Sequence, residues 1–150
     1  MARFSAAFRS TGAGSATLPL GSIWATAAVR PRVVEVGVFN TTATAVTVAL
    51  CRFSTGAGTK GAAITPLYEN DNSQAAVTTC ANTHTVTPTT ISIALRQAAL
   101  GAAIGSGVIW TFGGGRTEGL IIPNTTTDGM GIIIPAGTGQ ICDISFTWDE

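Results

Sequence analysis

The sequence predicts an all-β fold, a single antiparallel β-sandwich domain of jelly-roll-like type that spans residues 1–150. Three observations support this prediction: apolar and polar residues alternate with a period of two, turn residues separate the alternating segments, and the length suits one domain. Domains typically contain about 100–150 residues, and a chain of this size buries roughly two thirds of its unfolded surface. The sequence has no linker or internal repeat, so we expect one core.

Alternation is clearest near the C-terminus, where Ile144, Phe146 and Trp148 share one face of the predicted strand. Period-two alternation is typical of strands with one buried face. The other predicted apolar sets are Val34/Val36/Val38, Val46/Val48/Leu50, Ile91/Ile93/Leu95 and Val108/Trp110/Phe112. In residues 44–53 the opposite face carries Ala45, Thr47, Ala49 and Cys51. We expect a neighbouring subunit to cover that face.

Gly, Pro and Asn residues separate the predicted strands at residues 40–42, 54–61, 113–115, 123–124 and 135–137. Short strands with such turns favour a sandwich or barrel over βαβ units. Two segments lack the pattern. We expect residues 69–87 to form a long excursion that binds or packs against a partner. Residues 94–104 have enough helix propensity for a short helical turn.

Charged residues make up only 11% of the chain and balance to a net charge of zero, against ~25% in an average soluble domain. Such a surface has little electrostatic protection against association. The chain has no basic run, so we expect no nucleic-acid partner. It also has no apolar run near the ~20 residues that span a membrane. Residues 1–9 lack the apolar core of a secretory signal, so we expect synthesis in a host cytoplasm without export.

The motif G-x-G-x-x-G occurs at residues 56–61, directly after a predicted strand. A dinucleotide site also needs a following helix and an acidic residue ~20 positions later. Pro66 blocks a helix here. The motif therefore indicates a flexible hairpin loop, and no cofactor is expected.

Other candidates for chemistry are isolated in the sequence. His84 is the single histidine, and no nucleophile elbow accompanies it. Cys51, Cys80 and Cys142 have neither a disulfide framework nor zinc spacing, so we expect small buried apolar residues. The acids near residues 69–72 lack calcium-loop spacing, and Asp149 and Glu150 suggest a solvated terminus. We therefore expect no metal site, no catalytic residue and no enzyme activity.

Seven residues are candidates for a subunit interface: Arg3, Phe4, Phe8, Arg9, Trp24, Thr47 and Ala49. The first four lie in an alternating N-terminal segment that we expect to act as an arm, adding a strand to a partner. Trp24 lies outside a clear alternating pattern, and Trp commonly anchors interfaces. Trp110 and Trp148 are in phase with apolar faces and are predicted in the core.

The C-terminal part contains Gly107-Val-Ile-Trp-Thr-Phe112, Gly119-Leu-Ile-Ile-Pro123, a Pro135-Ala-Gly-Thr138 turn and a final alternating strand. This part resembles small β-sandwich structural proteins of tailed bacteriophages, of the capsid decoration or cement type. The resemblance implies a homo-oligomer, most simply a trimer, that binds the major capsid protein lattice on the virion surface and braces it.

Two alternatives remain open at the level of sequence. A tail, neck or filament subunit would share the structural role but assemble head to tail. A carbohydrate-binding module is a second alternative, because many jelly rolls are lectins. Sugar sites usually expose aromatic rings, and Tyr68 with the strand-phased tryptophans gives that alternative poor support.

Overall fold

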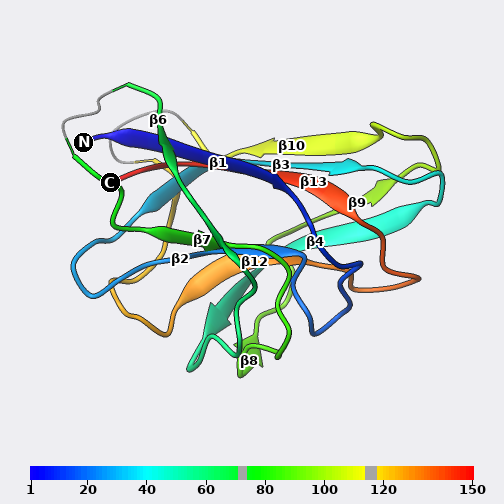
Figure 1. The fold of residues 1–150 in the computed structure, drawn as a ribbon, viewed down its shortest axis with the longest axis horizontal. Coiled ribbons are helices and arrows are strands. Elements are labelled where there is room, and N and C mark those ends of the chain that lie inside the picture. Colours follow the sequence, from blue (N-terminus) through cyan, green and yellow to red (C-terminus); the bar gives the residue numbers. More distant parts are fainter. Residues whose placement is uncertain (71–73, 114–117) are drawn as a thin grey trace.

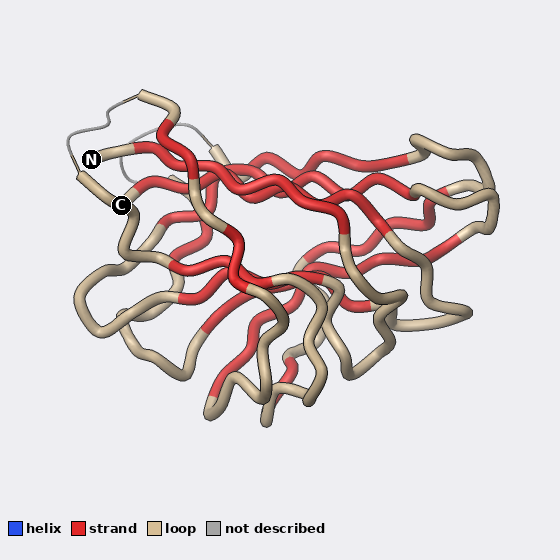
Figure 2. The backbone as a smooth tube through the Cα atoms, in the orientation of Figure 1, coloured by secondary structure: helices blue, strands red, loops and turns tan. Residues whose placement is uncertain are grey.

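The computed structural model describes residues 1–70, 74–113 and 118–150, which form two antiparallel sheets packed face to face. Figures 1 and 2 show the two layers of strands, and the described residues contain no helix. Sheet A has the order β10 (Gly107–Thr111), β3 (Arg32–Asn40), β13 (Cys142–Asp149), β1 (Arg3–Arg9), β6 (Leu67–Tyr68), with β11 (Leu120–Ile121) also on β3. Sheet B has the order β5 (Ala63–Ile64), β7 (Thr79–Ala81), β2 (Gly21–Trp24), β12 (Gly129–Ile133), β4 (Val46–Ser54), β8 (Thr90–Ile91), with β9 (Arg96–Leu100) also on β4.

The longer strands interleave as in a jelly roll. Strands of four residues or more are, in chain order, β1, β2, β3, β4, β9, β10, β12 and β13. Counted 1 to 8 in that order, strands 1, 8, 3 and 6 lie side by side in sheet A; these are β1, β13, β3 and β10. Strands 2, 7, 4 and 5 lie side by side in sheet B; these are β2, β12, β4 and β9. Two Greek keys wound in this way make a jelly roll. The predicted all-β, jelly-roll-like sandwich is confirmed.

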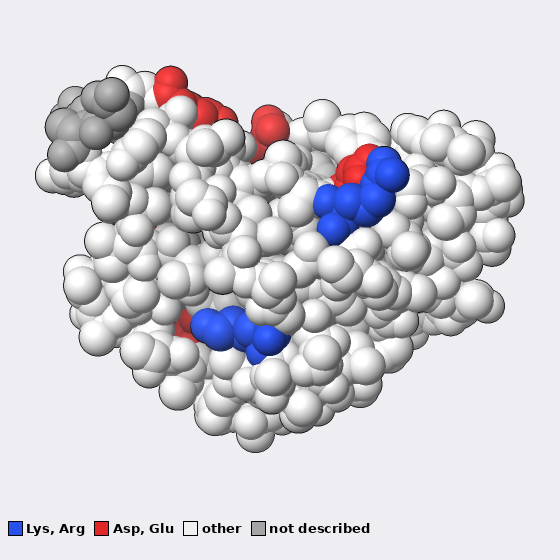
Figure 3. All heavy atoms as spheres, in the orientation of Figure 1, with Lys and Arg blue, Asp and Glu red and all other residues white. Residues whose placement is uncertain are grey.

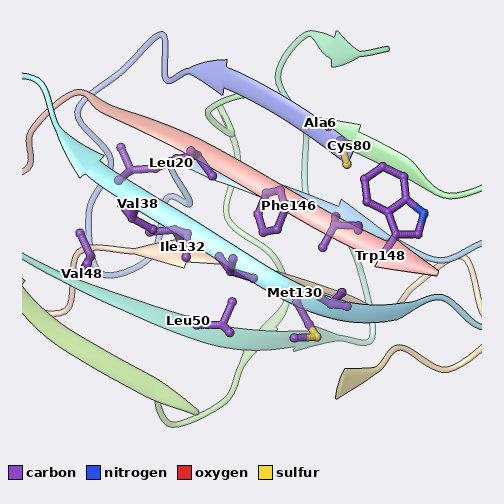
Figure 4. Close-up of a cluster of buried hydrophobic side chains, with 14 of the residues drawn as sticks. Ala6, Leu20, Val38, Val48, Leu50, Cys80, Met130, Ile132, Phe146 and Trp148 are labelled. Atoms are coloured by element: carbon purple, nitrogen blue, oxygen red, sulfur yellow. The ribbon is translucent and has the colours of Figure 1, made fainter. Parts of the chain in front are cut away.

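The main core lies between the sheets (Figure 4). The predicted faces Ile144/Phe146/Trp148 and Val46/Val48/Leu50 all point into it. Trp110 is half-buried against the same core. All three cysteines are buried and free, as their isolated spacing predicted. Period-two alternation therefore identified the inward face of the long strands correctly.

Two predicted apolar sets are partly wrong: in β3 one position is out of phase, and in residues 91–95 Ile91 packs on the outward face of sheet B whereas Leu95 packs on the main core. In β3 the pairing with β13 shifts between Thr147 and Trp148, so that Glu35 pairs with Thr147 but Val33 pairs with Trp148. This bulge puts Val33 into the core in place of Val34, because an extra residue reverses the phase of a strand. Ile93 is 91% exposed, since β8 ends at Ile91 before the expected set is complete.

Two segments without a pattern also differ from expectation. Residues 94–104 contain the strand β9 instead of a helical turn, because pairing along β4 outweighs local helix propensity. The segment between β4 and β9, residues 55–95, packs on its own chain in its described part, and we call it the excursion. Within it, β6 joins sheet A at β1, and β7 joins sheet B at β2. Asp71 and Asn72, and most of the turn predicted at 113–115, lie outside the described residues.

The two termini are fastened to the fold, which corrects the expectations of a free arm and a solvated end. β1 pairs with β13 along its whole length. Asp149 is buried and accepts two hydrogen bonds from Arg3, at 2.8 and 2.9 Å. The Glu150 carboxylate accepts the backbone N–H groups of Val77 and Thr78 at 2.6 and 3.1 Å. Pairing within the chain therefore uses the strand that was expected to reach a partner.

Candidate docking face

The outward face of sheet B is a second, smaller core. It contains Trp24, Ala49, Cys51, Phe53 and Ile133, all buried, with Ala57 and Ile91 packed against them. The excursion covers these residues, and Thr59 and Val86 bridge its two limbs. The side chains of Trp24 and Ala49 are fully buried. The prediction that they contribute to a subunit interface is wrong, because the chain itself covers them.

Glycines on β12 let two aromatic rings lie flat on sheet B. A Cβ on Gly129 would lie 2.5 Å from the Trp24 ring, and one on Gly131 would lie 2.7 Å from the Phe53 ring. The two rings are stacked, with centroids 5.6 Å apart. Lys60 Nζ lies 5.2 Å from the centroid of a Trp24 ring, within range of a cation–π interaction.

The one histidine lies beneath this cover. His84 Nε2 and Ser22 Oγ are 2.7 Å apart, and Trp24 Nε1 donates to the same Ser22 oxygen at 2.7 Å. The pKa of His84 is lowered to about 4, mainly by burial and to a lesser degree by the charge of Lys60, while the nearby backbone of Val86 and Ala57 opposes the shift. Ser22 and His84 are 0% and 2% exposed, so the pair is closed to a substrate. Its role is to hold the excursion against β2.

The sequence carried no signal for this contact. Ser22 and His84 are 62 residues apart in the chain, and neither belongs to a motif. Only the packing of the excursion on sheet B brings them together.

Within the described residues, the outward face of sheet A has no such cover from a strand or loop with its own apolar residues. We call it the sheet A face. It is formed by the outward side chains of four strands: Ser5, Ala7 and Arg9 of β1, Asp143, Ser145 and Thr147 of β13, Glu35, Gly37 and Phe39 of β3, and Gly107, Ile109 and Thr111 of β10. Small side chains dominate its centre, so a partner's backbone can approach closely.

Charges on the sheet A face are confined to its ends and mostly paired. Arg9 donates to Asp143 at 2.7 and 2.9 Å, and this contact lowers the pKa of that carboxyl. The Arg3–Asp149 pair lies at the opposite end of the same two strands. In the view of Figure 3, charged side chains form a few separate groups on an otherwise uncharged surface. The predicted interface residues Arg3 and Arg9 are thus on this face, each held by an internal ion pair.

A half-buried phenylalanine lies across the face. A Cβ on Gly107 would lie 2.2 Å from the Phe39 ring, so the ring rests where that strand has no side chain. Phe39 and Ala7 also help to line a shallow hollow that extends to the Arg9–Asp143 pair. A second hollow, lined by Glu35, Thr111 and others, lies at the opposite end. Flat small residues between two hollows give a surface that another protein can fit.

The remaining predicted interface residues are divided between core and surface. Phe4 is buried against Trp148, with ring centroids 6.0 Å apart. Phe8 is half-buried, points inward and covers Gly21. The prediction that these two rings face a partner is wrong, because β1 turns its even-numbered side chains to the core. Thr47 is partly exposed on β4 and lines a small hollow with Ala99.

In the described residues, the side chains that could take part in a reaction or bind a metal are not grouped at either outward face. Burial raises the pKa of Cys51 and Cys142 to about 11, which keeps these thiols protonated. Across the described ranges no three His, Cys, Asp or Glu side chains are grouped as metal ligands. Residues 56–61 form a loop that leads from β4 towards β5, but β4 and β5 do not pair with each other, so the loop is not the predicted hairpin. Among the residues whose structure is described, no helix has the length and hydropathy to cross a membrane.

No family model, curated protein or solved structure matches this chain.

Proposed function

We propose that the chain is a non-enzymatic structural protein of a virion, a homo-oligomeric capsid decoration protein that binds the major capsid protein lattice through the sheet A face. The observation that carries the proposal is the contrast between the two outward faces. Part of the segment between β4 and β9, including Ala57, His84 and Ile91, covers the outward face of sheet B, whereas no comparable apolar layer of the described residues covers sheet A. A flat face of small side chains, with its charges at the ends and mostly paired, offers little obstacle to close contact with another protein.

The sheet A face suits a permanent partner better than a small ligand. Its hollows are shallow and open, and its polar groups are largely satisfied by the Arg3–Asp149 and Arg9–Asp143 pairs. A lattice protein offers the extended, complementary surface that such a face needs. The resemblance of residues 107–150 to decoration proteins supports the same partner class.

The first test is binding of the purified chain to capsids assembled from the major capsid protein of the same genome. Ala7→Lys puts a charge on the exposed part of the face at β1, beside the hollow near Arg9, and Ala27→Lys puts the same charge in an exposed turn as a control. Ala7→Lys should weaken co-sedimentation about tenfold or more, because burying an unpaired charge costs over ~1.4 kcal/mol. Ala27→Lys should bind as the unmodified chain does.

Native mass spectrometry and negative-stain imaging test the assembly. A closed oligomer fits a decoration protein, and the trimer implied by the resemblance is one such form. Open filaments or tall rings would instead indicate a tail or neck subunit. A strictly monomeric chain that does not bind the capsid would overturn the proposal.

A further inference from the structure

We infer that the free edge of β10 is the site where a second copy of this chain pairs, antiparallel and about a two-fold axis at Ile109. The inference deepens the proposed function, on which it rests for self-association, and it names the strand and the register. It uses the edge of sheet A at β10, and so leaves the part of the sheet A face on β1, β13 and β3 free for a different partner.

Within the described residues the edge of β10 is open, because β10 ends the order of strands in sheet A. On the other side, Asn40 N donates to Ser106 O at 2.7 Å, and Phe112 N donates to Val34 O at 2.8 Å. In an antiparallel strand the N–H and C=O of one residue point the same way, and successive residues alternate. The even-numbered residues therefore bond to β3. The backbone groups of Gly107, Ile109 and Thr111 point away from it.

Natural sheets usually protect such edges with charge, proline, bulges or a covering segment. The edge of β1 is protected, since β6 pairs with part of it and Asn82 Nδ2 donates to Arg9 O at 3.0 Å. At the edge of sheet B, β9 carries Arg96 and Gln97. β10 has the sequence GVIWT, with neither charge nor proline, and its pairing with β3 is regular. It is therefore suited to accept another strand.

A second copy of β10 is complementary to the first. A two-fold axis at Ile109 places Ile109 opposite its own copy, and Gly107 opposite Thr111 of the second copy. Each of these is a pair of residues whose backbone groups face outward, so every outward group of both strands gains a partner. Moving the axis by one residue leaves an outward-facing residue of each strand without a partner in β10. The register with the axis at Ile109 is thus the one that satisfies the edge completely.

The side chains support the same register. Ile109 is 55% exposed on the outward side of β10, and pairing would bury it against its copy. On the inward side, half-buried Val108 would lie opposite Trp110 of the second copy, which extends the core across the boundary. Aromatic and β-branched residues form favourable cross-strand pairs. The guanidinium of Arg96 lies 5.5 Å from the centroid of the Phe112 ring, next to this boundary, and this exposed side chain can keep its charged group in solvent.

Cysteine cross-linking tests the register directly. In the paired form the two Cα atoms at position 109 would be about 5.5 Å apart, within disulfide range. Those at position 111 would be about 13 Å apart, because the strands run in opposite directions. Under mild oxidation Ile109→Cys should give a covalent dimer at least about tenfold faster than the matched control Thr111→Cys. The native cysteines are buried and should react slowly. Equal rates, or a faster control, would overturn the inference.

Amide hydrogen exchange of the unmodified chain gives a second readout that needs no variant. Raising the protein concentration should slow exchange at Gly107, Ile109 and Thr111 about tenfold or more, as mass action fills the dimer. Val108 and Trp110 bond to β3 and should be protected at every concentration. A trimer by mass spectrometry without slowed exchange at the odd positions would overturn this inference but keep the proposed function. A monomer that does not bind capsids would overturn both.

Discussion

The two outward faces of the sandwich begin alike and end differently. On each, a phenylalanine ring lies on a glycine of the neighbouring strand: Phe53 on Gly131 in sheet B, and Phe39 on Gly107 in sheet A. The excursion then buries Phe53 together with Trp24 and His84, whereas Phe39 stays half-exposed. The same local arrangement therefore serves as core on one face and as accessible surface on the other.

The comparison indicates that the two outward faces serve different properties, the face of sheet B stability and the face of sheet A binding. Sheet B has packed layers on both sides, so changes on its outward face should affect folding. Sheet A has one packed layer, so changes on its outward face should affect assembly more than folding. The following predictions test that division, from the largest expected effect to the smallest.

Removal of the two phenylalanine rings should give very different losses of stability. Phe53→Ala empties a fully buried site and should lower the free energy of unfolding by about 3–5 kcal/mol. Phe39→Ala removes a half-exposed ring and should cost roughly 1–2 kcal/mol. Urea unfolding followed by tryptophan fluorescence measures both. Equal losses would contradict the division between the faces.

A methyl group added beneath each ring should show whether the ring can move aside. A Cβ on Gly131 would lie 2.5 Å from the backbone oxygen of Gly21 as well as against Phe53, so Gly131→Ala should cost about 2–3 kcal/mol. Beneath Phe39, a Cβ on Gly107 would lie 2.2 Å from the ring and 2.7 Å from its Cγ, so the ring must swing towards solvent. Because the ring is half-exposed, Gly107→Ala should cost less than Gly131→Ala, about 1–2 kcal/mol. Thermal unfolding of the two variants checks this order, and a reversed order would be incompatible with a covered sheet B.

Acid should loosen the cover of sheet B selectively. The pKa of His84 is about 4 in the folded chain, below its ordinary value of 6.5, so the unfolded chain binds the proton first as the pH falls. Stability from this group is complete above pH 6.5 and is lost between about pH 6.5 and 4, on the order of 2–3 kcal/mol. The slope of unfolding free energy against pH measures it. His84→Gln should flatten that slope, and an unchanged slope would contradict the assignment.

The two ion pairs at the ends of β1 should show the smallest effects. The Arg3–Asp149 pair has side chains 32% and 10% exposed, and Arg3→Met should cost about 1 kcal/mol. The Arg9–Asp143 pair is 65% and 46% exposed, and Arg9→Met should leave unfolding unchanged because solvent screens the pair. High salt should reduce the first effect. A larger loss for Arg9→Met would show that the sheet A face contributes to folding.

Period-two patterns predicted inward positions well and outward positions poorly. Val46 and Leu50 were placed correctly, because every strand of a sandwich buries one face. Ala49 on the same strand was expected at an interface and is buried within the chain. The pattern of a strand cannot show what lies on its second face. A distant segment such as the excursion decides that.

The sequence by itself determined a great deal about this chain: few charged residues with no net charge, β-forming segments, inward faces predicted by alternation, and cysteines expected as buried residues. The tertiary structure decided the rest. It showed that the excursion covers sheet B, that β1 and the last residues pair within the chain, and that β10 ends its sheet with an open edge. These facts depend on contacts between residues far apart in sequence, such as Ser22 with His84 and Arg3 with Asp149. Alternation is local and carries no information about which strands become neighbours.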